Sequence, residues 1–461
     1  MGNSVYIKEL NGFVVTECKI SKEINTHGHT YVKGYLTGDF TDNTKRILAS
    51  GEILTVSALD SADNAKDVFM GIVDSYEVVR QSGYDELSVN LVAATKLIDI
   101  QKKTAAFTNM GETYDNIIDY VCRMCGVNFE NNSLVKGSIR KISMQYEETD
   151  WEYLKRLVSE KNSFLVPAYE KNYCYIYIGL PKGETKYLNS IEYTEEVDYV
   201  DYVLKNKNGI MTFLENETSY IFTSRQFYSL GTFICAAEIS GVVYKCELEM
   251  KGADLEGTYY IKKEDGLKMI PAKNYQIIGA SILAEVVGVE GDKVQAVMQV
   301  PGRQSEPCMM EFATVYSSTG DSGWYCMPED NDLVRVYFPC EDEKEAFIFN
   351  AMQVDKEEKK PEIKFFRNPQ GKEIEFAPTY LKISNGKGLS ITLDDDNGIS
   401  IKNESGTAIE MVSDADIIME STSGSIDISA KEKISLSRAA TKIVLEKDVI
   451  ISGEQVHVKE L

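Results

Sequence analysis

The fold is decided by the stretch ITLDDDNGISIKNESGTAIEM, residues 391–411. In this stretch two apolar residues flank one polar residue, and the triplet recurs after a turn rich in Gly, Asn, Asp and Ser. Similar triplets continue to Leu461 at a spacing of roughly eight or nine residues, which is typical of a β-solenoid repeat. Because side chains alternate between the two faces of a strand, the apolar residues of each triplet share one face. The residues predicted to face inward are Ile391, Leu393, Ile399, Ile401, Ile409, Met411, Ile426, Ile428, Ile434, Leu436, Ile443 and Leu445.

The composition of these repeats predicts that several chains share one core. Two apolar residues per strand cannot enclose a core within one chain, and no Phe, Tyr or Trp follows Tyr380. Aliphatic, largely β-branched filling suits a narrow axis. We therefore predict that residues 377–461 of three chains wind into a triple-stranded β-helix, a triangular prism formed by a homotrimer. The nine triplets, stacked at ~4.8 Å per layer, predict a rod of ~43 Å.

The pattern of residues 1–278 predicts β structure interrupted by helices. Short apolar runs separated by Gly, Asn and Asp indicate antiparallel β domains at residues 1–110 and 166–278. Between them, residues 111–165 contain two amphipathic patterns, and the second begins with TDWE at 149–152, a capping box. We predict a mainly β fold in which two related barrel-like domains carry a small helical insertion.

Residues 279–354 predict a further small domain. Five or six short strands in about 75 residues fit a closed barrel of the OB-fold type. OB-folds that read oligonucleotides line their groove with basic and aromatic residues, whereas acidic residues dominate here, so nucleotide binding is disfavoured. The charged residues 355–376 are predicted to form a solvated connector to the repeats.

The charge balance narrows the classes of partner. The 461 residues include 72 Asp+Glu against 49 Lys+Arg, a formal net charge of −23. This charge repels phosphate backbones, so nucleic acid and anionic membranes are poor partners. No apolar run approaches the length that crosses a bilayer, and the start MGNSVYIKELNG lacks the pattern of a signal peptide. We expect assembly in the cytoplasm without a signal peptide.

The residue types that most often carry chemistry are scarce. Nine cysteines without a secretion signal are expected to be reduced, and Cys122 and Cys125 share the apolar face of a predicted helix. The three histidines are His27 and His29, expected to face solvent at a turn, and His457, which strand alternation directs away from the prism axis. We therefore predict no metal site and no cofactor.

Adjacent carboxylates are the remaining candidates for catalysis. Glu147-Glu148 and residues 394–396 are such runs, but they are expected by chance in so acidic a chain, and residues 394–396 read as a turn between strands. The sequence contains no Gly-x-Ser-x-Gly and no His-Glu-x-x-His motif. We predict no catalytic residues, although a peptidoglycan-degrading tail hydrolase stays open as an alternative.

Three segments carry a resemblance to a known family. MQYEETDWEYLKRL at 144–157 resembles the segment QY-x-E-(S/T)-D-x-x-F/Y-L-x-R-L, and FMGIV at 69–73 resembles F-x-G-x-V. MPEDNDLVRVYF at 327–338 resembles P-E-x-G-D-E-V-x-V-x-F, with Asn331 in place of the glycine because Asn also tolerates positive φ. These motifs and the order of domains are similar to those of the VgrG family of type VI secretion and to the hub and spike proteins of phage tails and phage-tail-like bacteriocins.

The resemblance implies a structural role in a contractile injection machine. In this family three chains form a pseudo-sixfold hub, which docks onto a hexameric tail tube among baseplate proteins. Contraction then drives the spike through the target envelope, so the target membrane is contacted only during puncture. A trimeric receptor-binding tail fibre is the alternative, although fibres usually end in an aromatic-rich head that this chain lacks.

The resemblance also implies a partner at the tip. The last predicted strand would leave Val456, Val458 and Leu461 of three chains close to water, beside unpaired backbone groups. We predict that a PAAR-like tip protein binds these residues and that effector cargo could be attached through it.

Overall fold

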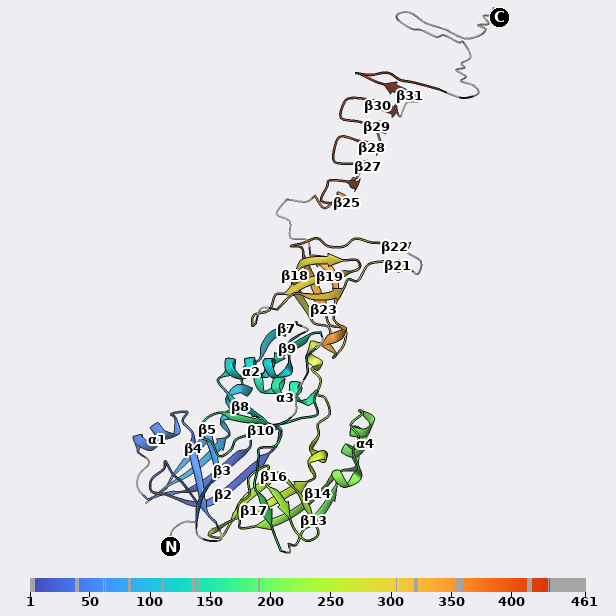
Figure 1. The fold of residues 1–461 in the computed structure, drawn as a ribbon. Helices are drawn as coiled ribbons and strands as arrows, with labels where there is room; N and C mark the ends of the chain where they lie inside the picture. The colour runs from blue at the N-terminus through green and yellow to red at the C-terminus, as the bar shows by residue number, and fades with distance from the viewer. Residues whose placement is uncertain are drawn as a thin grey trace, which may run out of the picture. The chain divides into compact units, whose positions relative to one another are not determined.

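The computed structural model describes residues 5–37, 41–60, 62, 64–81, 84–109, 111–133, 137–139, 141–189, 191–303, 305–318, 322–352, 360–412, 417–429 and 431. The chain divides into two compact units, residues 1–354 and 355–461. We call them the N-terminal unit and the C-terminal unit. Both are built mainly of β-sheets, most of them antiparallel (Figure 1). Within the described ranges, no helix combines the length and the apolar character that crossing a membrane requires.

The largest sheet of the N-terminal unit has twelve strands. Its main path runs in the order β1-β4-β5-β6-β3-β2-β16-β17-β14-β13, and β15 pairs with both β16 and β12. The strands are β1 (Val5–Ile7), β2 (Phe13–Glu23), β3 (His29–Leu36), β4 (Leu54–Leu59), β5 (Ala65–Gln81), β6 (Tyr84–Val92), β12 (Thr185–Tyr187), β13 (Thr194–Val197), β14 (Thr218–Ser224), β15 (Phe233–Cys235), β16 (Ser240–Lys251) and β17 (Asp254–Lys262).

The pairing of β2 with β16 joins the two halves of this sheet. Ile20 lies opposite Leu248 in an antiparallel register, and both residues belong to one buried core cluster that also contains Val89 and Tyr259. The sequence interpretation had separated residues 1–110 and 166–278 into two barrel-like domains, whereas here both share one sheet and one core. Hydrophobic periodicity identifies strands but does not identify their partners, so this long-range pairing was not predicted.

The helices lie mostly where the sequence placed them. The α-helices are α1 (Asp42–Leu48), α2 (Tyr114–Cys125), α3 (Asp150–Ser159) and α4 (Tyr199–Lys207). The predicted capping box is confirmed at the start of α3, where the Thr149 hydroxyl accepts from the Glu152 amide at 3.1 Å and the Glu152 carboxylate accepts from the Thr149 amide at 2.9 Å. The short helices α1 and α4 were not predicted. The 3₁₀ helices are η1 (Ala94–Asp99), η2 (Leu214–Asn216), η3 (Glu264–Leu267), η4 (Tyr275–Ile277) and η5 (Glu343–Glu345).

A second core surrounds α2 and α3. Trp151 and Leu154 of α3 pack with Ile117 and Val121 of α2 in one buried cluster. Two small sheets lie in this region, with orders β10-β11-β8 and β7-β9. Their strands are β7 (Lys103–Phe107), β8 (Asn128–Asn131), β9 (Ser143–Glu148), β10 (Leu165–Pro167) and β11 (Tyr175–Ile178).

The last part of the N-terminal unit is a five-stranded sheet in the order β20-β19-β18-β23-β24. Its two edges meet, because Phe312, directly after β20, bridges in parallel to Ile348 of β24. Asn331 has a φ of 72°, so the predicted positive φ at this turn is confirmed. The strands are β18 (Ser281–Glu290), β19 (Lys293–Met298), β20 (Cys308–Glu311), β23 (Leu333–Tyr337) and β24 (Phe347–Met352), beside the hairpin β21 (Ser317–Ser318) and β22 (Ser322–Gly323).

The described residues of the C-terminal unit form one antiparallel sheet of seven strands, in which each strand pairs with the next in the sequence. β25 and β26 fall within residues 355–376, which the sequence interpretation had assigned to a connector. Phe366, Ile374 and Phe376 alternate with charged residues there, and the charge concealed the strand pattern. The strands are β25 (Lys364–Arg367), β26 (Glu373–Phe376), β27 (Tyr380–Ser384), β28 (Ser390–Asp394), β29 (Gly398–Lys402), β30 (Ala408–Met411) and β31 (Ile417–Glu420).

Candidate assembly surfaces

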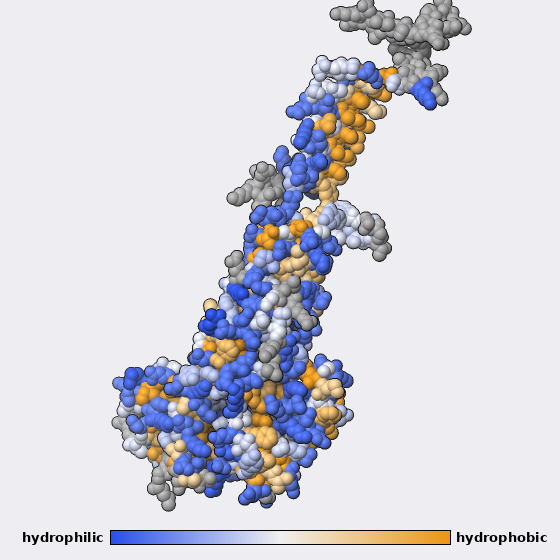
Figure 2. Space-filling view, viewed as in Figure 1, coloured by the Kyte–Doolittle hydropathy of each residue, from blue (hydrophilic) through white to orange (hydrophobic). Residues whose placement is uncertain are grey.

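One face of the C-terminal sheet is a continuous ladder of apolar side chains. Cross-strand register places Ile391 opposite Ile401 and Ile401 opposite Ile409, so all three lie on the same face. Figure 2 shows a continuous apolar patch along one side of the unit. We call this surface the apolar ladder; its members are Phe366, Ile374, Phe376, Leu381, Ile383, Ile391, Leu393, Ile399, Ile401, Ile409, Met411, Ile417 and Met419.

The opposite face of this sheet is polar over the central strands. Thr392 lies opposite Ser400, and Ser400 lies opposite Glu410. On the ladder, by contrast, Ile399 and Ile401 are 39% and 45% exposed. Soluble monomers rarely leave so long an apolar row uncovered, and such rows mark interaction surfaces.

The turns of the C-terminal sheet are built from polar side chains. The Asp394 carboxylate accepts hydrogen bonds from the amides of Asp396 at 3.0 Å and Asn397 at 2.8 Å. The Asn397 amide bond is the main reason why the pKa of Asp394 lies below its ordinary value. Gly398 follows with a φ of 82°, which only glycine adopts readily. The interpretation of residues 394–396 as a turn is therefore confirmed.

The remaining residues predicted to line the axis are not part of the observed ladder. Ile426 and Ile428 are exposed and belong to no strand of the structure. Ile434, Leu436, Ile443 and Leu445 lie outside the described residues, as do the tip residues Val456, Val458 and Leu461 and the neighbouring His457.

A second exposed apolar surface surrounds α4 in the N-terminal unit. Tyr199 and Val200 of the helix are 63% and 67% exposed, and Met211 and Phe213, which follow it, are 86% and 73% exposed. The helix is held by a buried ion pair, in which the Lys205 ammonium lies 2.8 Å from the Glu217 carboxylate. We call these exposed residues the α4 surface. The structure thus fixes the helix firmly while leaving its apolar side chains uncovered.

The segment 144–157 forms a buried junction with the five-stranded sheet. The Arg156 guanidinium of α3 makes two hydrogen bonds to Glu148, at 2.8 and 2.7 Å, and lies 2.8 Å from a Glu343 oxygen. The three side chains are only 8–9% exposed. Met144 at the start of the segment packs into the core of the five-stranded sheet with Val334. This segment therefore connects two cores of the N-terminal unit.

The junction has one positive group for two negative groups, because the Arg156 guanidinium pairs with both Glu148 and Glu343. Burial raises the pKa of Glu343 to about 7, although Arg156 lowers it. For Arg156, burial lowers the pKa, but the two carboxylates outweigh burial and raise it. Glu148, one of the acidic pair considered for catalysis, is thus engaged in a structural ion pair. The partnership with Glu343 was not predicted, since nothing in the local sequence links it to Arg156.

The histidines behave differently from one another. His29 is exposed, as predicted, but the prediction for His27 was wrong. The His27 ring is 12% exposed, hydrogen-bonds Asp99 at 3.1 Å, and lies 4.4 Å from the Trp151 ring centroid. Burial lowers its pKa. The turn signal HGH located the hairpin correctly but carried no information about the helix that packs onto it.

The cysteines Cys122 and Cys125 lie in the helical region of the N-terminal unit. Cys122 is buried in the core around α2, and Cys125 is partly buried beside it. Burial is the main reason why the pKa of Cys125 is raised to about 11, which keeps this thiol protonated. In the part of the chain that the structure describes, no three His, Cys, Asp or Glu side chains are placed to hold a metal ion together.

Comparisons with known proteins agree at the level of the fold. No family model and no curated protein matches the sequence. The E. coli protein c3393, described as a component of the type VI secretion system with structural similarity to the T4 bacteriophage tail proteins gp27 and gp5, matches with a TM-score of 0.54 and 13% identity. The match covers 76% of this chain and 99% of that chain.

Two structures of a Francisella PdpA-VgrG complex match over more of the chain. The half-lidded form has a TM-score of 0.54 and covers 87% of this chain and 88% of its own; the lidded form has a TM-score of 0.55 and covers 90% and 79%. Both are 10% identical to this chain. The predicted resemblance is therefore confirmed for the architecture: this chain has the fold of the VgrG-related proteins of type VI secretion systems.

Proposed function

We propose that three copies of this chain form the central hub and spike of a contractile injection machine. The observation that carries the proposal is the apolar ladder, which repeats strand after strand and stays exposed among the described residues of its unit. Burying a half-exposed Ile or Leu contributes on the order of 1 kcal/mol. Nine Ile and Leu residues of the ladder per chain, with two Phe and two Met beside them, would supply most of the apolar area that holds a prism of three chains together.

The N-terminal unit would form the hub. Two joined halves of the twelve-stranded sheet in each of three chains would supply six positions, which fits a hexameric tail tube. We assign the α4 surface to contacts within this ring, because its helix is rigidly held and its apolar side chains are exposed. Baseplate proteins would surround the ring.

The five-stranded sheet fits an OB-type barrel. Its strand order, with the parallel bridge from Phe312 to Ile348, closes the sheet as the OB topology requires. The buried junction of Arg156 with Glu148 and Glu343 fixes this barrel against the helical region. We infer a mechanical role for such a junction, because axial load during contraction would pass through these contacts. The proposed function is mechanical piercing, with no catalytic step.

At the free end of the spike we propose a small PAAR-like tip protein. Val456, Val458 and Leu461 are the residues that would meet it, and an effector could be attached through the same protein. The proposal rests on the sequence of the last repeats. Binding of the tip protein before and after deletion of residues 453–461 tests it.

The experiment that tests the assembly is light scattering on the purified full chain. A homotrimer has a mass of about 155 kDa, three times 51.7 kDa. A stable, folded monomer would contradict the proposal. Electron microscopy of the native particle, with this chain labelled, then locates the chain in the particle. A label at the end of the tail tube supports a hub, whereas a label at the far end of a fibre contradicts the proposal.

A further inference from the structure

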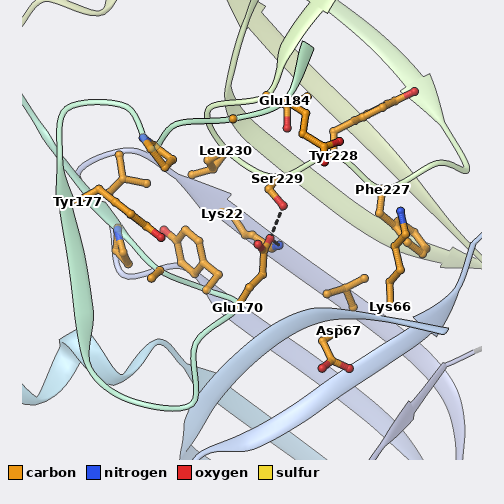
Figure 3. Close-up of a pocket in the computed structure, with 18 of the residues that line it drawn as sticks. Lys22, Lys66, Asp67, Glu170, Tyr177, Glu184, Phe227, Tyr228, Ser229 and Leu230 are labelled. Carbon is orange, nitrogen blue, oxygen red and sulfur yellow. Dashed lines mark hydrogen bonds and ion pairs between the residues drawn. The ribbon is translucent and has the colours of Figure 1, made fainter. Parts of the chain in front are cut away.

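A cavity of about 580 Å³ opens in the N-terminal unit between the two halves of the twelve-stranded sheet (Figure 3). β2 and β5 contribute Lys22 and Lys66 from the first half, and residues 166–171 and 227–232 form much of the wall from the rest of the unit. Small-molecule sites in proteins commonly have volumes of about 300–1,000 Å³ and lie between substructures. The size and position of this cavity are therefore those of a ligand site.

The cavity gathers positive charge in a strongly acidic chain. Its lining contains five lysines and three carboxylates, whereas the whole chain has a net charge of −23. The five lysines are Lys22, Lys66, Lys171, Lys182 and Lys186. The lining of the cavity thus carries a net positive charge although the whole chain is strongly negative, and this favours binding of an anion.

Two of these lysines are poorly neutralised. The side chain of Lys22 is only 4% exposed, and the carboxylate oxygen of Glu170 with which it pairs lies 3.6 Å away (Figure 3). Lys66 pairs with Asp60 at 3.8 Å. Both distances exceed those of a normal hydrogen bond, about 2.7–3.2 Å. Lys22 is buried with only this long ion pair and Lys66 is partly exposed, so an anion entering the cavity would gain charge-assisted hydrogen bonds from these ammonium groups.

Each carboxylate of the lining has a partner of its own. Asp67 lies 2.7 Å from the Lys8 ammonium and accepts a hydrogen bond from Ser57 at 2.7 Å. Glu170 accepts from the Ser229 hydroxyl at 2.5 Å, as Figure 3 shows. The third carboxylate, Glu184, pairs with Lys186 of the same lining. Five lysines against three carboxylates still leave the lining with a net positive charge.

Aromatic side chains form another part of the lining. Tyr177, Phe227, Tyr228 and Tyr259 line the cavity, and Tyr228 packs edge-on against Tyr259 with ring centroids 5.0 Å apart. Lys171 also belongs to the lining and lies 5.3 Å from the Tyr177 ring centroid. Tyr228 and Tyr259 are buried, at 5% and 0% exposure, so a planar ring would contact the partly exposed Tyr177 and Phe227.

We propose that this cavity binds a phosphate monoester that carries an aromatic ring, such as a nucleoside monophosphate. Lys22 and Lys66 hold the phosphate, and the aromatic lining receives the ring. A phosphate monoester has a charge of about −1.5 to −2 at pH 7, and the lysine ammonium binds phosphate as a compact point charge. This site does not depend on the assembly proposed above.

The test is calorimetric titration of the full chain with adenosine 5′-monophosphate, with adenosine and inorganic phosphate as matched probes. We expect saturable binding of the monophosphate, weaker binding of phosphate and none of adenosine. Lys22→Met and Lys66→Gln should each weaken binding of the monophosphate about tenfold, the loss of roughly 1.4 kcal/mol of charge-assisted hydrogen bonding. Lys19→Gln changes an exposed lysine of the same strand, paired with Glu17, and should leave binding unchanged.

Several outcomes overturn the proposal. The proposal is wrong if the monophosphate fails to bind at millimolar concentration, or if adenosine binds as tightly as the monophosphate. It is also wrong if the Lys66→Gln variant binds the monophosphate as tightly as the wild type. Tighter binding of a tetraglutamate peptide would assign the cavity to an acidic segment of a protein instead. Lys66 is 46% exposed, so Lys66→Gln stays informative even where the buried Lys22→Met disturbs folding.

Discussion

The strands of the two units use the same alternating pattern with opposite results. In β6 of the N-terminal unit, Leu87, Val89 and Leu91 are 0–1% exposed, because other strands and loops of the same chain cover them. In β29 of the C-terminal unit, Ile399 and Ile401 stay about two-fifths exposed. The alternation of apolar and polar residues therefore produces an apolar face on the strands of both units. In the N-terminal unit, segments that are distant in the sequence pack against that face and bury it. Among the residues that the structure describes, the apolar ladder has no such cover, and in the trimer proposed above other chains would supply it.

The largest effect is expected from a charge on the apolar ladder. Ile401→Asp would bring three carboxylates together on a dry axis, at a cost of several kcal/mol each, and should abolish the trimer. Ser400→Asp, one residue away on the polar face, should leave it intact. Light scattering and circular dichroism measure both. Equal behaviour of the two variants would contradict the assigned face.

A smaller effect is expected at the internally covered junction. Arg156→Met leaves Glu148 and Glu343 buried without their cation and should lower the free energy of unfolding of the N-terminal unit by about 3–5 kcal/mol. Arg123→Met removes an arginine that is 71% exposed and should change it by no more than about 0.5 kcal/mol. Urea denaturation measures both variants. An unchanged midpoint for Arg156→Met would show that the junction adds no stability.

The pH dependence of stability should follow Glu343. Its pKa in the folded state, about 7, lies above the ordinary value of 4.5, so folding favours the protonated form. The stability it contributes is complete below pH 4.5 and is lost as the pH rises through 7. Glu343→Gln should therefore flatten the decline of stability over this range, whereas Glu345→Gln, an exposed neighbour on η5, should not. Parallel profiles for the wild type and Glu343→Gln would exclude this assignment.

The smallest effect is expected when the chain is ended after Lys360. The N-terminal unit has its own buried cores, so its melting temperature should change by less than about 2 °C. The truncated chain should lose the prism but stay soluble. Scanning calorimetry of the two lengths makes the comparison. An insoluble product would mean that the C-terminal unit nucleates assembly for the whole protein.

Local signals in the sequence were sufficient for much of the fold. The capping box at Thr149 and Glu152, the positive φ at Asn331 and the triplets around Ile399 each depend on a few neighbouring residues, and each was predicted correctly. These features depend on local backbone hydrogen bonds and on the alternation of side chains along a strand, so the types of neighbouring residues are enough to predict them.

The features that were missed depend on residues far apart in the chain. The pairing of Ile20 with Leu248, the ion pair of Arg156 with Glu343 and the burial of His27 against Trp151 have no local signal. The cationic cavity was missed for the same reason, because its lysines come from separate segments. One sequence without homologues carries periodicity but does not report which distant residues meet.

The pairing of each C-terminal strand with its immediate successor has a consequence for folding kinetics. Pairing neighbouring strands closes only short loops, so it costs little conformational entropy and proceeds quickly. By contrast, β2 pairs with β16, which is more than 200 residues later in the chain and is synthesised much later. The ladder could therefore form within one chain first, and in the proposed trimer the encounter of three chains would be the slow, concentration-dependent step. Refolding of the full chain should accelerate as its concentration rises, until exposed ladders associate out of register and aggregation takes over.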